Sequence, residues 1–375
     1  MSLPAPASLF KIGRKASRKI VRLGRYHILR SLGVTLGPFC GGRGPLRGFL
    51  TSTRGAASRF ISISPARRVP FGVGRIADLP ETFVATLVNG RAFSDSGAVL
   101  TAEHRLVGDV SPVLMGELSG HSALSRAIFP KLEIHTQSIA VMSALLHQRY
   151  FHWMFDILPR FDLLRAAGID PDLFLVNFDL GFQQETLAAI GIDASRILNP
   201  APGTFLQASN LIVPSLPGRI TFMSPEGVAF LRKTFLGTTS PKPPQRRLYV
   251  SRSDATRRRL LNEDVLVRRL AALGFEHVVL DGMSVAAQVA LFNEARLITG
   301  PHGAGLTNLA FCQEGASLVE YMPDAFHNPC FEFLSTLLKL DYHCISSKTF
   351  PGPKSDQSVD VDQVCHIIEM QLRTS

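Results

Sequence analysis

The chain has 375 residues, of which 46% are hydrophobic and 19% charged, a composition that excludes a disordered or fibrous protein and allows a sizeable buried core. Its formal charge of +10 is unevenly distributed: residues 1–77 hold 15 of the 40 Lys and Arg and no acidic residue. The remainder therefore carries 25 basic against 30 acidic residues, a net charge of −5. Because a nucleic-acid-binding domain is normally basic on its binding face, this balance argues against such a function.

Residues 1–75 predict a basic leader and linker. Over residues 9–32, apolar residues recur every three or four positions with Lys and Arg between them, so a helix there would have a cationic face typical of helices that lie on anionic membranes. An inert basic tail and a targeting segment show the same pattern. Residues 33–75, rich in Gly, Arg and Ser, indicate a flexible connection. No stretch approaches the roughly 20 apolar residues of a membrane span.

Five cysteines without a CxxC pair indicate a reducing compartment and argue against a zinc cluster. We therefore expect a cytoplasmic protein, peripheral at the inner face of the cell membrane if the leader binds lipid.

Residues 76–237 predict a first lobe. Short apolar runs over 76–130 indicate strands, and 138–167 predict a helix interrupted near Pro159. The following alternation predicts strands at 172–177 and 208–213 and helices at 182–190 and 225–236. A Pro-rich run at residues 238–244 is the clearest linker, and we place the lobe boundary there.

Residues 238–375 predict a second lobe in which strands and helices alternate strictly. Strands are expected at 247–251, 277–280, 297–299, 317–320 and 342–345, with helices at 262–273, 285–295, 303–311 and 330–340. Such alternation predicts an α/β fold with a parallel, Rossmann-like sheet covered on both faces. Ligands of these sheets bind at the carboxyl ends of the strands.

The strongest motif, GPHGAGLTN at residues 300–308, lies between a predicted strand and helix. Glycines there let backbone amides approach an anion at a helix start, so a phosphate is the expected ligand, although a tight turn also requires glycine. Arg252 and Arg258 follow the first strand of this lobe and are suited to a diphosphate, with surface solvation as the alternative. Glu320 ends a strand and is expected either to accept hydrogen bonds from ribose hydroxyls or to pair with an arginine.

In the first lobe, His152, Asp156 and Arg160 lie four residues apart and share a helix face as far as Pro159 permits. A histidine held by a carboxylate is suited to act as a general base toward a hydroxyl, but the pair also suits a purely structural tie. The only tryptophan, Trp153, is suited to stack on a sugar or to fill the core.

Taken together, these motifs resemble glycosyltransferase family 61 over roughly residues 75–345. The matching positions are YFHW at 150–153, Asp156, Pro159-Arg160, YVSR at 249–252, Arg258, Asn262-Glu263, Gln288, Phe292, Ala295, residues 300–308 and Val319-Glu320. The resemblance implies a GT-B-like fold of two facing Rossmann-like lobes, a nucleotide-sugar donor held mainly by the second lobe, and inversion without an obligatory metal. Gln148-Arg149 depart from the family, whose members often have an Asn or a small residue there.

The resemblance implies roles for individual residues. His152 and Asp156 become catalytic candidates on the acceptor side. The donor-site candidates are Arg252, Arg258, His302, Gly303, Ala304, Gly305, Thr307, Asn308 and Glu320. No cofactor or metal ligand is expected. The Asp-x-Asp at Asp360 and Asp362 is better explained as a helix N-cap than as a metal site.

The sequence thus predicts an inverting, metal-independent glycosyltransferase. It would transfer a sugar from a nucleotide-sugar donor, most simply a UDP-sugar, to a hydroxyl of a polysaccharide, capsular or otherwise, or of a lipid-linked glycan. A catalytically silent nucleotide- or carbohydrate-binding module is the first alternative. A serine hydrolase is the second, because HGAG at residues 302–305 is similar to an oxyanion loop; however, the sequence around Ser122 lacks the last glycine of a nucleophile elbow.

Overall fold

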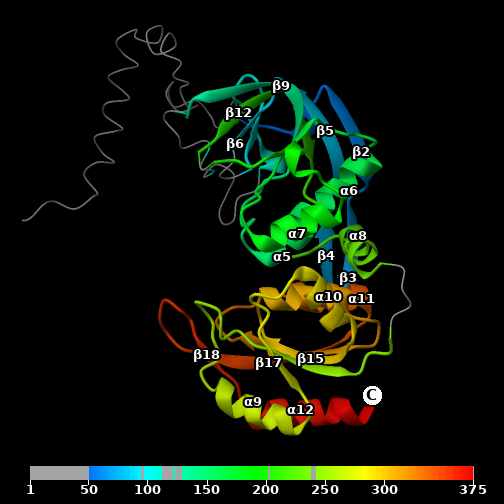
Figure 1. Ribbon diagram of the computed structural model, residues 1–375, viewed down its shortest axis with the longest axis vertical. Helices are drawn as coiled ribbons and strands as arrows, with labels where there is room; N and C mark the ends of the chain where they lie inside the picture. Colours follow the sequence, from blue (N-terminus) through cyan, green and yellow to red (C-terminus); the bar gives the residue numbers. More distant parts are fainter. Residues whose placement is uncertain are drawn as a thin grey trace, which may run out of the picture.

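The computed structural model describes residues 50–93, 97–111, 121, 123, 129–201, 203–237 and 242–374. The amphipathic leader, Cys40 and Ser122 lie outside these residues. The described part is a mixed α/β structure with two sheet-containing lobes stacked along its long axis (Figure 1). No described helix is long and apolar enough to cross a membrane.

The first lobe contains a mixed ten-stranded sheet with two long parallel strands, β9 (Leu132–Val141) and β12 (Phe205–Pro214), at its centre. On one side, β10 (Leu173–Leu175) and β11 (Ile197–Leu198) continue the parallel arrangement. On the other side, β12 pairs antiparallel with β5 and β6. The remaining strands extend the sheet: β1 (Leu50–Thr51), β2 (Arg59–Ser64), β5 (Thr82–Val88), β6 (Arg91–Phe93), β7 (Val99–Leu100) and β8 (Leu106–Val107).

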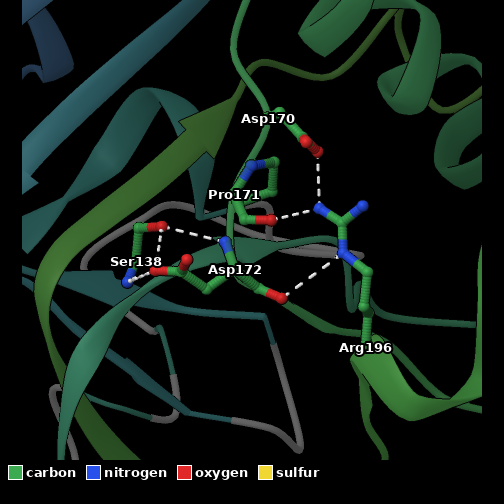
Figure 2. A network of polar contacts seen from close by, with 5 residues as sticks. All are labelled: Ser138, Asp170, Pro171, Asp172 and Arg196. Carbon is green, nitrogen blue, oxygen red and sulfur yellow. Dashed lines mark hydrogen bonds and ion pairs between the residues drawn. The ribbon is translucent and has the colours of Figure 1, made fainter.

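The helix predicted from residue 138 is wrong over its first part, because residues 138–141 belong to β9. A shift in register between β9 and β12 precedes Ser138, and Ser138 then binds Asp172 (Figure 2). The Ser138 backbone amide and Oγ each lie 2.7 Å from the Asp172 carboxylate, while Arg196 joins Asp170 and the backbone carbonyls of Pro171 and Asp172. This network fixes the start of β10 beside β9.

The helical run after β9 contains a π-turn. It consists of α5 (Tyr150–His152), the π-helical η5 (Trp153–Ile157) and α6 (Leu158–Ala166), so the interruption expected near Pro159 lies just before it. Trp153 is fully buried and donates its indole N–H to Thr186 Oγ1 at 2.8 Å, on α7 (Gly181–Ala189). Trp153 is therefore a core residue.

The flexible connection predicted over residues 33–75 is wrong for residues 50–75, which are folded. Besides β1, the short helix α3 (Thr53–Ala56) and β2, this stretch forms a hairpin of β3 (Arg67–Phe71) and β4 (Arg75–Leu79). The hairpin reaches the second lobe, where Phe71 packs against Phe333 and Arg75 pairs with Glu332 on α11 (Cys330–Leu338) (Figure 1). The basic composition of this stretch concealed its buried residues.

The second lobe has a six-stranded sheet in the order β14-β13-β15-β16-β17-β18, parallel except for β18. The strands are β13 (Arg246–Val250), β14 (Glu276–Val278), β15 (Ala295–Pro301), β16 (Ser317–Pro323), β17 (Asp341–Thr349) and β18 (Gln357–Ser358). The other helices are α9 (Glu263–Ala272), α10 (Val285–Asn293), the 3-10 helix η7 (Ala304–Phe311) and α12 (Val361–Thr374). The first lobe ends in α8 (Pro225–Leu236), before the predicted linker.

Candidate functional site

A cavity of about 1320 Å³ lies between the lobes. From the first lobe it is lined by residues that follow β9 and β10, including Arg149, His152 and Glu185. From the second lobe it is lined by the loops after β13, β14, β15 and β16. Because all of these strands are parallel within their own sheets, the carboxyl ends of both sheets contribute to one cavity, as expected for ligand sites of such sheets.

Arg252 and Arg258, which the sequence suggested as a pair suited to a diphosphate, both line this cavity. Arg252 donates from Nη2 to the backbone carbonyl of Arg257 at 3.1 Å, and the Arg258 guanidinium lies 5.2 Å from the centre of the Phe326 ring. Burial, followed by the charge of the other arginine, lowers the pKa of Arg252 to about 10. Burial and neighbouring arginines also lower the pKa of Arg258. Both arginines are thus partly desolvated cations, and such cations interact strongly with an anion.

The glycines of residues 300–305 allow neighbouring groups to approach the loop closely. A Cβ on Gly300 would lie 2.6 Å from the Val250 carbonyl oxygen, and one on Gly303 only 1.8 Å from Arg252 Nη1. Gly303 has an extended backbone with φ 178° and precedes the helix expected here, η7, which is of the 3-10 type. The loop therefore lets Arg252 lie directly against the start of η7.

His302 lines the cavity and is held from behind by a buried carboxylate. Its Nδ1 lies 2.6 Å from Glu320 Oε1, and the Tyr342 hydroxyl donates to Glu320 Oε2 at 2.8 Å. Glu320 is fully buried and does not line the cavity. Its position does not fit the expected contact with a ribose, because both carboxylate oxygens already accept hydrogen bonds from protein side chains. No arginine among the described residues forms an ion pair with Glu320.

Thr307 and Asn308 are also fully buried, whereas Ala304 and Gly305 line the cavity. Asn308 connects the lobes: its Oδ1 accepts from the Tyr150 hydroxyl at 3.0 Å, and its Nδ2 donates to Gln288 Oε1 at 2.8 Å. Asn308 therefore positions the site from beneath.

The second histidine pair lies on the first-lobe side of the cavity. His152 lines the cavity, and its Nδ1 lies 2.7 Å from Asp156 Oδ2. Burial raises the pKa of Asp156, while the bond to His152 and the charge of Arg160 act in the opposite direction. Arg160 is buried and donates to the carbonyls of Met142 and Pro214, so it ties the helix to the ends of β9 and β12.

Several charged cavity residues were missed as site candidates, among them Arg149, Glu185 and Asp281. Arg149 was noted only as a departure from a family pattern, yet it lines the cavity opposite the second lobe. Glu185 and Asp281 supply carboxylates to the cavity, and Glu185 also accepts from the Val285 amide at 2.7 Å. Neither carboxylate lies in a motif, so only the tertiary structure identifies them.

Asp360 and Asp362 lie at the start of α12. Asp360 Oδ1 accepts from the amides of Asp362 and Gln363 at 3.0 and 3.1 Å, which confirms the N-cap. Among the described residues, no group of three or more His, Cys, Asp or Glu is arranged to hold a metal ion.

Comparison with known proteins gives two matches. Residues 150–319 match the family model described as Glycosyltransferase 61, a range that includes both arginines, His152 and the loop at residues 300–308. This segment belongs to glycosyltransferase family 61. The chain is also 36% identical over 87 residues to the alpha-1,3-arabinosyltransferase XAT3 of Oryza sativa subsp. japonica. That match covers 22% of this chain and 15% of the rice protein, so the chain spans only a small part of its relative.

Several residues of the family 61 pattern serve to shape the cavity. Tyr249 and Ser251 both donate to Glu263 Oε1, at 2.7 and 2.6 Å, which fixes the segment leading into Arg252. Asn262 exchanges two hydrogen bonds with the Val359 backbone. These contacts hold the loop of Arg252 and Arg258 between α9 and the segment before α12.

Proposed function

We propose that this protein is an inverting glycosyltransferase that moves a sugar from a nucleotide-sugar donor to a hydroxyl of a polysaccharide or lipid-linked glycan. The observation that carries the proposal is one cavity at the carboxyl ends of both sheets, lined by Arg252, Arg258 and two histidines that are each held by a buried carboxylate. The family 61 segment supports a sugar donor and a glycan acceptor. The facing lobes support a GT-B-like arrangement.

The reaction would be a direct displacement. The acceptor hydroxyl loses its proton to Nε2 of His152, whose Nδ1 proton is held by Asp156. The acceptor oxygen then bonds to the anomeric carbon while the bond from that carbon to the diphosphate oxygen breaks, with its electron pair leaving on the nucleoside diphosphate. Arg252 and Arg258 stabilise the charge that develops there, so the proposal requires no divalent ion.

His302 would act on the donor side. With Nδ1 donating to Glu320, its Nε2 remains for the cavity, where it is suited to bind a phosphate or sugar oxygen. The carboxylates of Glu185 and Asp281 are better placed than Glu320 to accept hydrogen bonds from ribose or sugar hydroxyls. The match to an arabinosyltransferase makes pentose donors candidates alongside hexoses. We further propose a cytoplasmic location, with the basic leader bringing the enzyme to anionic membranes and their lipid-linked acceptors.

A thermal-shift screen of nucleotide sugars, followed by a transfer assay, tests the proposal. We expect Arg252→Ala to weaken donor affinity and lower turnover together. We expect His152→Gln to lower kcat by about 10²- to 10⁴-fold with little change in donor affinity, as loss of a general base does. Binding without transfer in the wild type would favour the silent module, and ester cleavage abolished by Ser122→Ala would favour the hydrolase.

A further inference from the structure

We propose that Arg149 is a third diphosphate-binding arginine, supplied from the first lobe to a donor held mainly by the second. This inference rests on the proposed function, since it requires a nucleoside diphosphate in the cavity. It concerns a residue at which the chain departs from the usual family pattern.

The backbone of Arg149 is held in a fixed position. Its backbone amide donates to the Leu146 carbonyl at 2.8 Å, and its carbonyl accepts from the Trp153 amide at 2.9 Å. The preceding loop is anchored by Gln183, which donates to the His147 carbonyl at 3.2 Å. The next residue, Tyr150, is bonded to Asn308 across the lobes. Arg149 is therefore an exposed side chain on a well-anchored backbone at the lobe junction.

Positive charge is concentrated around Arg149. Arg149 lines the same cavity as Arg252 and Arg258, and its charge helps to lower the pKa of both. Among the ion pairs of the described residues, none involves any of these three arginines. Asp254 is the acidic side chain that opposes the lowering at Arg252. Three cations that repel one another form a site for an anion, because a bound anion offsets their mutual repulsion.

The negative charge of the ligand increases during the reaction. A nucleotide sugar carries two negative charges on its diphosphate. Departure of the nucleoside diphosphate creates a terminal phosphate whose second pKa is about 6, so a third negative charge is present at pH 7. Arg252 and Arg258 match the two charges of the bound donor. Arg149 balances the third charge, which appears when the bond between the anomeric carbon and the diphosphate oxygen breaks.

The test compares nucleotides that differ only in phosphate number. Of UDP, GDP, ADP and CDP, the one that most raises the unfolding temperature is titrated by calorimetry together with its monophosphate. The proteins are the wild type, Arg149→Ala, Arg149→Lys, Arg252→Ala and Arg259→Ala. Arg259 is the matched control, because it carries the same charge on the same loop as Arg258 but does not line the cavity.

We expect Arg149→Ala to weaken diphosphate binding about 10-fold or more while changing monophosphate binding by less than about 2-fold, as loss of a charged hydrogen bond to one phosphate would. Arg149→Lys should recover part of the loss, and Arg259→Ala should bind like the wild type. Unchanged diphosphate binding in Arg149→Ala, alongside a clear loss in Arg252→Ala, would overturn the inference alone. An equal loss in Arg259→Ala would also overturn the inference, because it would indicate a non-specific electrostatic effect of nearby positive charge. Absence of nucleotide binding in the wild type would instead overturn the proposed function.

Discussion

The Arg252 guanidinium occupies the space that a side chain at residue 303 would need. Gly303 therefore matters for the position of Arg252. Because a Cβ at residue 303 would lie 1.8 Å from Arg252 Nη1 and 2.8 Å from its Cζ, Gly303→Ala should displace the guanidinium. We expect this substitution to weaken nucleoside diphosphate binding by about 10-fold, as calorimetry would measure. Adding Gly303→Ala to Arg252→Ala should cause little further loss, because both changes remove one interaction. Additive losses in this cycle would show that Gly303 acts independently of Arg252.

His104 should make the folding stability depend on pH. Burial and the neighbouring Arg91 lower the pKa of His104 to about 4. Above its unfolded pKa of about 6.5 the imidazole is neutral in both states. As pH falls from 6.5 toward 4, the unfolded chain binds the proton first, so stability is lost in this window.

Because His104 is only half-buried, we expect a loss of about 1 kcal/mol between pH 7.5 and 5. His104→Asn is the appropriate variant, since asparagine tolerates the left-handed backbone at φ 64°. Urea unfolding of both proteins at the two pH values should show a smaller pH effect in the variant. Equal pH effects would mean that other groups dominate the window.

At the scale of elements, the β3–β4 hairpin connects the lobes. Phe71 is 4% exposed and packs against Phe222 and Phe333, whereas Val73 at the tip is 97% exposed. We expect Phe71→Ala to lower the free energy of unfolding by about 3 kcal/mol, because it leaves a cavity among aromatic rings. Val73→Ala should change it by less than about 0.5 kcal/mol. Urea denaturation measures both values, and a silent Phe71→Ala would place the hairpin outside the cooperative fold.

The elements that the sequence predicts well are those whose patterns are local. Helix α8 has the expected bounds, since Ser224 and Pro225 mark its start, and the alternation of the second lobe follows from short apolar runs separated by polar joints. The helix expected from residue 138 fails because Ser138 is fixed by Asp172, a partner 34 residues away. Glu320 was expected at the end of a strand, but it lies in the middle of β16, and its burial depends on Tyr342 and His302, which no local pattern reveals.

At the scale of the whole molecule, the structure sets where the leader can be cut. Residues 50–75 are folded, so a deletion of residues 1–48 is the appropriate test of the basic segment. If the segment binds lipid, this deletion should abolish sedimentation with phosphatidylserine vesicles and leave nucleotide binding unchanged. Binding of the truncated protein to the vesicles would contradict the tether. Loss of nucleotide binding would show that the leader contributes to the fold.

The contact between Phe71 and Phe333 also orders events during synthesis. The hairpin leaves the ribosome early, but its partner on α11 is made only after the intervening 261 residues. Until then Phe71 has Phe222 but not Phe333 to pack against, so the nascent first lobe leaves part of this apolar contact surface uncovered. The packing of α11 onto this hairpin can therefore form only after most of the second lobe has been synthesised.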